Sequence, residues 1–294
     1  MTKLFDCYVA ADWSAANKPV KGRDSIWLCA QWQDGGASHR IIENIPTRNA
    51  ALKRIEEMVL KGAGEGRRML FSFDFGFGYP RGTADALWRR SDWRGVWEGL
   101  AHDIEDDETN RSNRFKAAAQ YNERLKKPVF WGRPPHRLDL EPHLPAKNPK
   151  ASELPARRIV EGLVPRAKSL FQLSYAGAVG SQSLLGIAAL ERLRQRLEGR
   201  VKVKVWPFET AFDRNFSEGP SMVLAEIYPT LFLPQGDKSM TKDKAQVMEV
   251  VRRCADLDRK GALRPLLAPP PGLSAEDIEV MGREEGSILG AGRL

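Results

Sequence analysis

The sequence is poor in the side chains that bind soft metal ions or form disulfides. Its 294 residues include only three cysteines and four histidines. Cys7, Cys29 and Cys254 are far apart and odd in number, which fits neither a disulfide framework nor a CxxC-type zinc site. The histidines show no HExxH spacing. Any bound metal ion is therefore expected to have oxygen ligands.

The sequence also lacks a long apolar run. No stretch approaches the roughly 18 apolar residues that a membrane-spanning helix needs, and a hydrophobic content of 42% with 29% charged residues is typical of a globular protein. The first residues, MTKLFDCYVAADWS, lack the basic start and long apolar stretch of a secretory signal. We therefore expect a cytoplasmic protein without a membrane partner; the oligomeric state stays open.

Positive charge is concentrated in one part of the chain. Residues 111–170 contain 14 Lys/Arg and 5 Asp/Glu, a net charge of +9, whereas the whole chain carries +8. The rest of the chain is thus close to neutral, at −1. A basic segment of this kind is typical of phosphate binding, although a solvated surface alone would look the same.

Hydrophobic periodicity predicts an α/β fold. Apolar, β-prone runs predict strands at residues 4–11, 25–32, 38–45, 69–75, 201–206 and 222–228. Apolar residues at helical spacing predict helices after Thr47, at 184–197 and at 243–256, and a basic helix at 113–126. We expect one domain, residues 1–294, with a mixed β-sheet flanked by helices. Residues 1–80 and 201–294 form its core, and residues 81–200 form a large, mostly helical and irregular insertion.

Carboxylates occur where these strands end. Asp12 closes the first strand, Asp74 lies near the end of the fourth, and Glu226 lies inside the apolar run VLAEIYP. An unpaired buried charge costs several kcal/mol, so each needs a counter-charge. Arginine or lysine partners are one possibility, but shared divalent cations would also explain why all three stand at strand ends that can converge in an open sheet.

Asp243 is a fourth candidate, at the start of the last clear helix. The helix dipole favours a negative charge there, so Asp243 could equally be a plain helix-cap residue. Glu284 and Glu285 compete with it for the last acidic place.

Other residues are candidates for substrate contacts. Ser14 and Asn17 follow Asp12 in a polar loop that an ordinary turn would also explain. Basic side chains could grip a phosphate backbone while an aromatic residue among them stacks on a base. The candidates for nucleic-acid binding are Lys18, Arg111, Arg114, Lys116, Lys126 and Lys127.

The order strand, strand, strand, helix, strand, with acids at these places, resembles the ribonuclease H-like superfamily, which includes RuvC-type resolvases. More closely, several blocks are similar to an uncharacterised bacterial family of predicted nucleases with this fold. These blocks run through nearly the whole chain: FDCYVAADWSAANKP, FSFDFGFGYP, FQLSYAGAVGSQSLLG, VWPFET, AEIYPTLF, KDKAQV and EEGSILG.

The resemblance implies a ribonuclease H-like fold and a metal-dependent nuclease that hydrolyses DNA or RNA with two Mg²⁺ or Mn²⁺ ions. Asp12 would bridge both ions, Asp74 and Asp243 would complete their shells, and Glu226 would bind a metal or orient the attacking water.

Two alternatives remain. One is an ATP-dependent phosphotransferase of the actin and sugar-kinase type, although DWSAANKP lacks the glycine-rich phosphate turn expected there. The other is a non-catalytic nucleic-acid-binding module whose carboxylates serve only in ion pairs.

Overall fold

A mixed β-sheet forms the centre of the computed structural model, which describes residues 3–34, 36–149, 152–214, 216, 219, 221–232 and 241–294. The strands in these ranges are β1 (Cys7–Asp12), β2 (Ile26–Asp34), β3 (Ala37–Ile45), β4 (Arg68–Phe73), β5 (Lys202–Val205) and β6 (Ser221–Glu226). They are ordered β3-β2-β1-β4-β6-β5. The pairs β1–β2 and β2–β3 are antiparallel, whereas β1, β4, β6 and β5 run parallel. The expected α/β fold with a mixed sheet is confirmed.

Helices connect and cover the strands. The longer ones are α1 (Arg48–Gly64), α3 (Trp93–Asp103), α4 (Arg114–Arg124), α6 (Gly180–Leu197) and α7 (Lys242–Arg259). Shorter ones are α2 (Thr83–Trp88), α5 (Ile159–Leu163), α8 (Leu263–Leu266) and α9 (Ala275–Val280), with turns η1 (Leu138–Leu140), η2 (Pro229–Leu231) and η3 (Met281–Glu285). The expected strands and helices are thus confirmed, with ends shifted by a few residues. Among the described residues, no helix has the length and apolar character to cross a bilayer.

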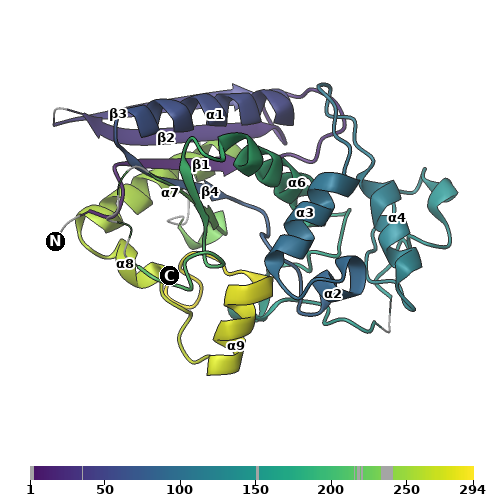
Figure 1. Cartoon of the computed structure of the whole chain (residues 1–294). Helices are drawn as coiled ribbons and strands as arrows, with labels where there is room; N and C mark the ends of the chain where they lie inside the picture. Colours follow the sequence, from purple (N-terminus) through teal and green to yellow (C-terminus); the bar gives the residue numbers. More distant parts are fainter. Residues whose placement is uncertain are drawn as a thin grey trace.

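The sheet is buried on both faces. Side chains of β1 alternate between two apolar clusters, with Val9 and Ala11 in one and Tyr8 and Ala10 in the other. Residues of α1 and α6 complete the first cluster, and those of α7 complete the second. Figure 1 shows α1 and α7 on opposite sides of the strands. Burial on both faces explains why β1, β4 and β6 are almost continuously apolar in sequence.

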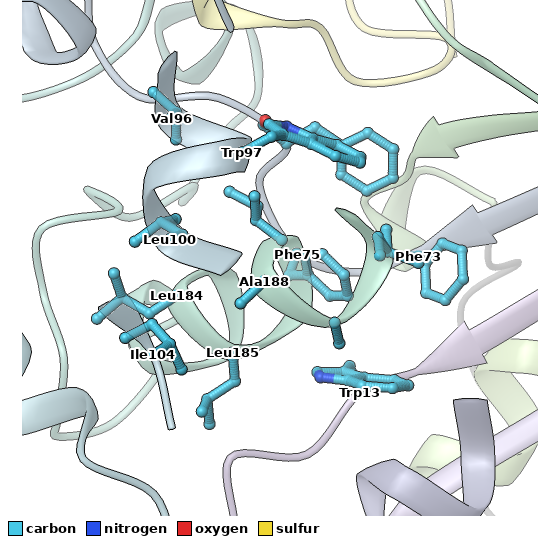
Figure 2. Close-up of a cluster of buried hydrophobic side chains, with 14 of the residues drawn as sticks. Trp13, Phe73, Phe75, Val96, Trp97, Leu100, Ile104, Leu184, Leu185 and Ala188 are labelled. Atoms are coloured by element: carbon cyan, nitrogen blue, oxygen red, sulfur yellow. The ribbon is translucent and has the colours of Figure 1, made fainter. Parts of the chain in front are cut away.

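The chain between β4 and β5 builds the side of the molecule that carries α2, α3 and α4 (Figure 1). Its last helix, α6, contacts α1, α3 and β5, so the segment expected as an insertion shares the core of the sheet. A Cβ at Gly186 in α6 would overlap the ring of Phe75, which shows why glycine is needed there. Trp13, Phe73, Phe75 and Trp97 pack beside α6 in this cluster (Figure 2).

The N-terminus is fastened to the end of α7 by one buried carboxylate. Asp258 accepts hydrogen bonds from the backbone N–H groups of Leu4 and Phe5 at 2.9 Å each and from the hydroxyl of Tyr8 at 2.6 Å. These three donors satisfy a charge that is only 2% exposed. Asp258 therefore holds α7 against β1.

We predict that Asp258→Ala lowers the free energy of unfolding by about 3 kcal/mol, because buried donors lose their acceptor. Asp256→Ala is the matched control, since Asp256 lies on the same helix and its partners Arg252 and Arg259 are exposed; it should cost at most about 1 kcal/mol. Urea denaturation measures both, and equal losses would contradict the assignment.

Candidate active site

The main cavity lies at the carboxyl ends of the parallel strands and has a volume of about 580 Å³. Because β1, β4 and β6 run in the same direction, their last residues share one edge of the sheet, with Ala11 opposite Phe73 and Phe73 opposite Glu226. Asp12, Asp74, Glu226 and Asp243 all line this cavity. Four carboxylates that are distant in sequence are thus brought to one place.

Asp12 and Asp74 come from neighbouring strands. Asp12 is the last residue of β1, and Asp74 follows the last residue of β4. The side chains of Phe73 and Phe75 enter the apolar core, whereas Asp74 between them lines the cavity, as strand alternation requires. Asp74 Oδ1 accepts a hydrogen bond of 2.8 Å from the backbone N–H of Trp13. This bond joins the two strand ends that carry the acids.

Helix α7 brings Asp243 to the same cavity. Asp243 lies in its first turn, and the helix packs across β1 and β2. Its Oδ2 accepts a hydrogen bond of 3.1 Å from the backbone N–H of Asp24, another residue at the cavity.

The two competing glutamates lie elsewhere. Glu284 accepts a hydrogen bond from Ala84 N–H in the first turn of α2, and Glu285 accepts bonds from the N–H groups of Arg81 and Ile159. Neither glutamate lines the cavity. Both carboxylates satisfy backbone donors inside the fold, so Asp243 is the one of the three acids that accompanies Asp12 and Asp74.

Asp12 and Asp74 are electrostatically unfavourable as a pair. Burial, together with the nearby charges of Asp74 and Asp243, raises the pKa of Asp12 to about 9, while Lys242 opposes the rise. Burial likewise raises the pKa of Asp74 to about 7, although the hydrogen bond from Trp13 lowers it. The acidic end of the cavity therefore has more negative charge than the described side chains around it neutralise.

Glu226 is in a different electrostatic situation. Its two carboxylate oxygens accept hydrogen bonds of 2.6 and 2.8 Å from the guanidinium of Arg158, and Oε2 also accepts one from the backbone N–H of Phe77. Arg158 also pairs with Glu161, and all three charged side chains are buried. Burial raises the pKa of Glu226, but Arg158 opposes this rise. Because Glu226 already pairs with Arg158, it is not a candidate metal ligand.

Among the residues that the structure describes, no three His, Cys, Asp or Glu side chains are arranged to hold an ion. Mg²⁺, however, is usually bound through one or two carboxylates together with waters and substrate phosphates. Asp12 and Asp74 are a donor set of this kind, since both carboxylates line one cavity at the ends of neighbouring parallel strands. The residues present are therefore compatible with Mg²⁺ or Mn²⁺.

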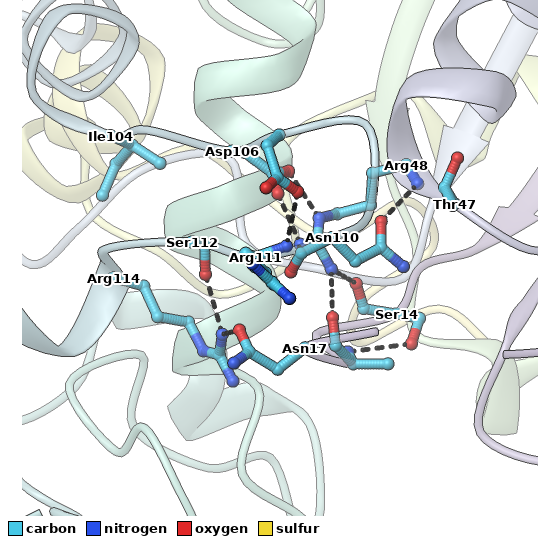
Figure 3. Close-up of polar contacts among 12 residues, drawn as sticks. Ser14, Asn17, Thr47, Arg48, Ile104, Asp106, Asn110, Arg111, Ser112 and Arg114 are labelled. Carbon is cyan, nitrogen blue, oxygen red and sulfur yellow. Dashed lines mark hydrogen bonds and ion pairs between the residues drawn. The ribbon is translucent and has the colours of Figure 1, made fainter. Parts of the chain in front are cut away.

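The loop after Asp12 is held rigidly by a buried arginine. Arg48 donates hydrogen bonds to the carbonyl oxygens of Ser14 at 3.0 Å and Ala16 at 2.8 Å, and to both oxygens of Asp106 at 2.6 Å. Asn110 binds the carbonyl oxygen of Lys18 at the end of the loop. Figure 3 shows these groups converging on the loop. The segment between α3 and α4 thus fixes one wall of the cavity.

The residues expected to bind nucleic acid do not form one surface of equivalent charges. Five of them are exposed: Lys18, Arg111, Lys116, Lys126 and Lys127. Arg114 is only 8% exposed and donates hydrogen bonds to Asn17, Ser112 and Ser181 (Figure 3). Burial lowers its pKa to about 10. Arg114 joins α4 to α6 and to the loop after Asp12, and none of the six residues lines the cavity.

The structure adds cavity residues that the sequence did not single out. Arg158, Arg166 and Lys168 lie on its insertion side, and Gln182 of α6 binds the carbonyl oxygen of Trp13 at 2.7 Å. Arg158, Arg166 and Lys168 belong to the basic segment 111–170, so the sequence indicated the region but not the residues. Its local composition does not show which of the 14 Lys/Arg side chains line the cavity.

Comparisons with protein-family models, with curated proteins and with solved structures give no match to this chain.

We predict that Asp12→Asn stabilises the protein in EDTA. A carboxyl group whose pKa is higher in the folded chain opposes folding when it ionises, so its cost appears as the pH rises from about 4 towards the folded pKa of about 9. At pH 8 the variant should melt about 2–4 °C above the unchanged protein, a shift equivalent to about 1 kcal/mol. At pH 4 the difference should vanish.

Glu226→Ala is the control with the opposite sign. It removes one of the two carboxylates paired with Arg158 and leaves the buried N–H of Phe77 without an acceptor, so it should lower the free energy of unfolding by about 1–3 kcal/mol. Thermal melts of both variants at the two pH values make the comparison. A destabilised Asp12→Asn protein at pH 8 would show that Asp12 has a stabilising partner.

Proposed function

We propose that this chain is a divalent-cation-dependent nuclease with a ribonuclease H-like fold. The observation that carries the proposal is the meeting of Asp12, Asp74 and Asp243 at one cavity, where Asp74 and Asp243 lie close enough to Asp12 to raise its pKa. The order β1, β2, β3, α1, β4 supports the fold assignment, since it is the order that the sequence resemblance implies.

Positive groups at the same cavity support a phosphate-containing substrate. Lys242, Arg166 and Lys168 line it and are exposed. Lysine and arginine attract phosphates and position them, whereas a cavity with acids alone would repel them. The combination of an acidic end and a basic wall therefore favours phosphodiester chemistry.

The chain's own groups have distinct parts in this proposal. Asp12 and Asp74 concentrate negative charge at the ends of rigid strands, and the hydrogen bond from Trp13 fixes the orientation of Asp74. Asp243, held through Asp24, approaches from α7. The bound cation would activate water and stabilise the leaving oxygen. Glu226 and Arg158 hold the floor of the cavity together.

We predict that Asp12→Asn and Asp74→Asn each reduce cleavage of labelled single- or double-stranded DNA or RNA by about a hundred-fold or more, the scale of losing one electrostatic group in an active site. Cleavage is measured with Mn²⁺ and with EDTA. Asp256→Asn is the control, because Asp256 lies on α7 but outside the cavity, and it should leave cleavage unchanged.

Binding of Mn²⁺ gives a test that does not need the substrate. The ion should raise the melting temperature at pH 8, EDTA should reverse the rise, and Asp12→Asn should abolish it. The proposal fails if calorimetry detects no Mn²⁺ binding and all nucleic acids stay intact. Stabilisation by ATP without cleavage would instead favour the phosphotransferase.

A further inference from the structure

Basic side chains line the same cavity as the acids. Arg166 and Lys168 are among them, and the sequence holds no aspartate or glutamate between Glu161 and Glu191. Both side chains are exposed. A long anionic ligand can therefore contact both a cation held by Asp12 and Asp74 and these two basic side chains.

The side chain of Lys168 is placed by a neighbouring loop. A Cβ at Gly177 would lie 3.8 Å from Cε of Lys168, so the lysine stem lies along the backbone of this loop. Gly177 and Ala178 line the cavity as well. The ammonium group of Lys168 is thereby kept at the cavity wall.

An exposed aromatic ring stands two residues before Gly177. Tyr175 is 51% exposed, one of few large apolar side chains on the described surface. Its backbone is left-handed, with φ of 78°, a strained conformation for a bulky residue that is typical of functional segments. Its hydroxyl donates a hydrogen bond of 3.1 Å to the carbonyl oxygen of Arg133, and much of the ring is open to solvent.

The size of the cavity limits what can enter it. A volume of about 580 Å³ is that of sites for small molecules, roughly 300–1,000 Å³. Base-paired strands are far larger. A cavity of this volume holds a single nucleotide, which favours an unpaired strand as its ligand.

We infer that residues 166–178 form a grip for single-stranded nucleic acid, in which Arg166 and Lys168 bind backbone phosphates and Tyr175 stacks on an unpaired base. This combination of positive groups with an aromatic platform is how proteins bind single strands without reading sequence. The inference rests on the proposed function for its choice of substrate.

Equilibrium binding in EDTA tests the grip without cleavage. The probes are a fluorescein-labelled 12-mer of deoxythymidine, the same length of uridine, and a 12-base-pair duplex, each followed by fluorescence anisotropy. Tyr175→Ala should weaken binding of both single strands about 5- to 100-fold, the range for loss of one stacked base. Lys168→Ala should weaken it too and reduce the slope of log K against log salt by about 0.7. The duplex should bind more weakly and be unaffected by Tyr175→Ala.

Two control variants separate stacking and local charge from other causes. Tyr175→Phe keeps the ring and loses the hydroxyl, so it should bind like the unchanged protein and should still quench a 2-aminopurine base placed in the strand. Lys260→Ala removes an equal charge at the far end of α7, about 25 Å from Asp243 at 1.5 Å per residue, and should have little effect.

Specific outcomes would overturn the inference. It fails if Tyr175→Ala binds normally, if Tyr175→Phe is as weak as Tyr175→Ala, or if the duplex shows the same dependence on Tyr175. If the protein cleaves nucleic acid but Tyr175→Ala does not change single-strand affinity, the single-strand site is refuted and the nuclease function is not. Binding that depends on Tyr175 in a protein that cleaves nothing would support the grip and refute the nuclease.

Discussion

The convergence of Asp12 and Asp74 on one edge of the sheet is the constraint on which the candidate site depends. Because β1 and β4 are adjacent and parallel, acids at their ends cannot separate. The repulsion between them is tolerated because both faces of the sheet are covered by apolar side chains from α1, α6 and α7. The same packing carries Asp243 to the cavity. The fold therefore sustains a local concentration of carboxylates at the edge of its sheet.

Two kinds of buried acid can be distinguished in this chain. Asp258, Glu226, Glu284 and Glu285 each have hydrogen-bond donors directed at their oxygens, and they tie distant segments together. Asp12 instead has two carboxylates near it, Asp74 and Asp243, which add to the effect of burial on its pKa. Burial alone does not separate these groups. The number and charge of their partners distinguish them. Glu226 is paired with Arg158 and is for this reason not proposed as a metal ligand.

The segment between β4 and β5 has a part in every wall of the site. Asp106 pairs with Arg48, which holds the loop after Asp12, Arg158 pairs with Glu226, and Lys168 lines the same cavity as the acids. An acidic strand edge alone would repel a phosphate. The sheet supplies the acids and the inserted segment supplies the basic groups, so the cavity exists only where the two meet.

The sequence by itself determined the sheet, because alternating and continuous apolar runs report the burial of each strand locally, and it placed Asp12 and Asp74 at strand ends. Tertiary structure alone decided the rest. The choice of Asp243 over Glu284 and Glu285 depends on where α7 packs, and the partner of Glu226 lies 68 residues away. Likewise Arg114, one of the six basic residues expected to bind nucleic acid, is buried and donates hydrogen bonds to Ser181 of α6 and to Asn17 in the loop after Asp12. Such pairings join segments that are distant in the chain, so no local pattern records them.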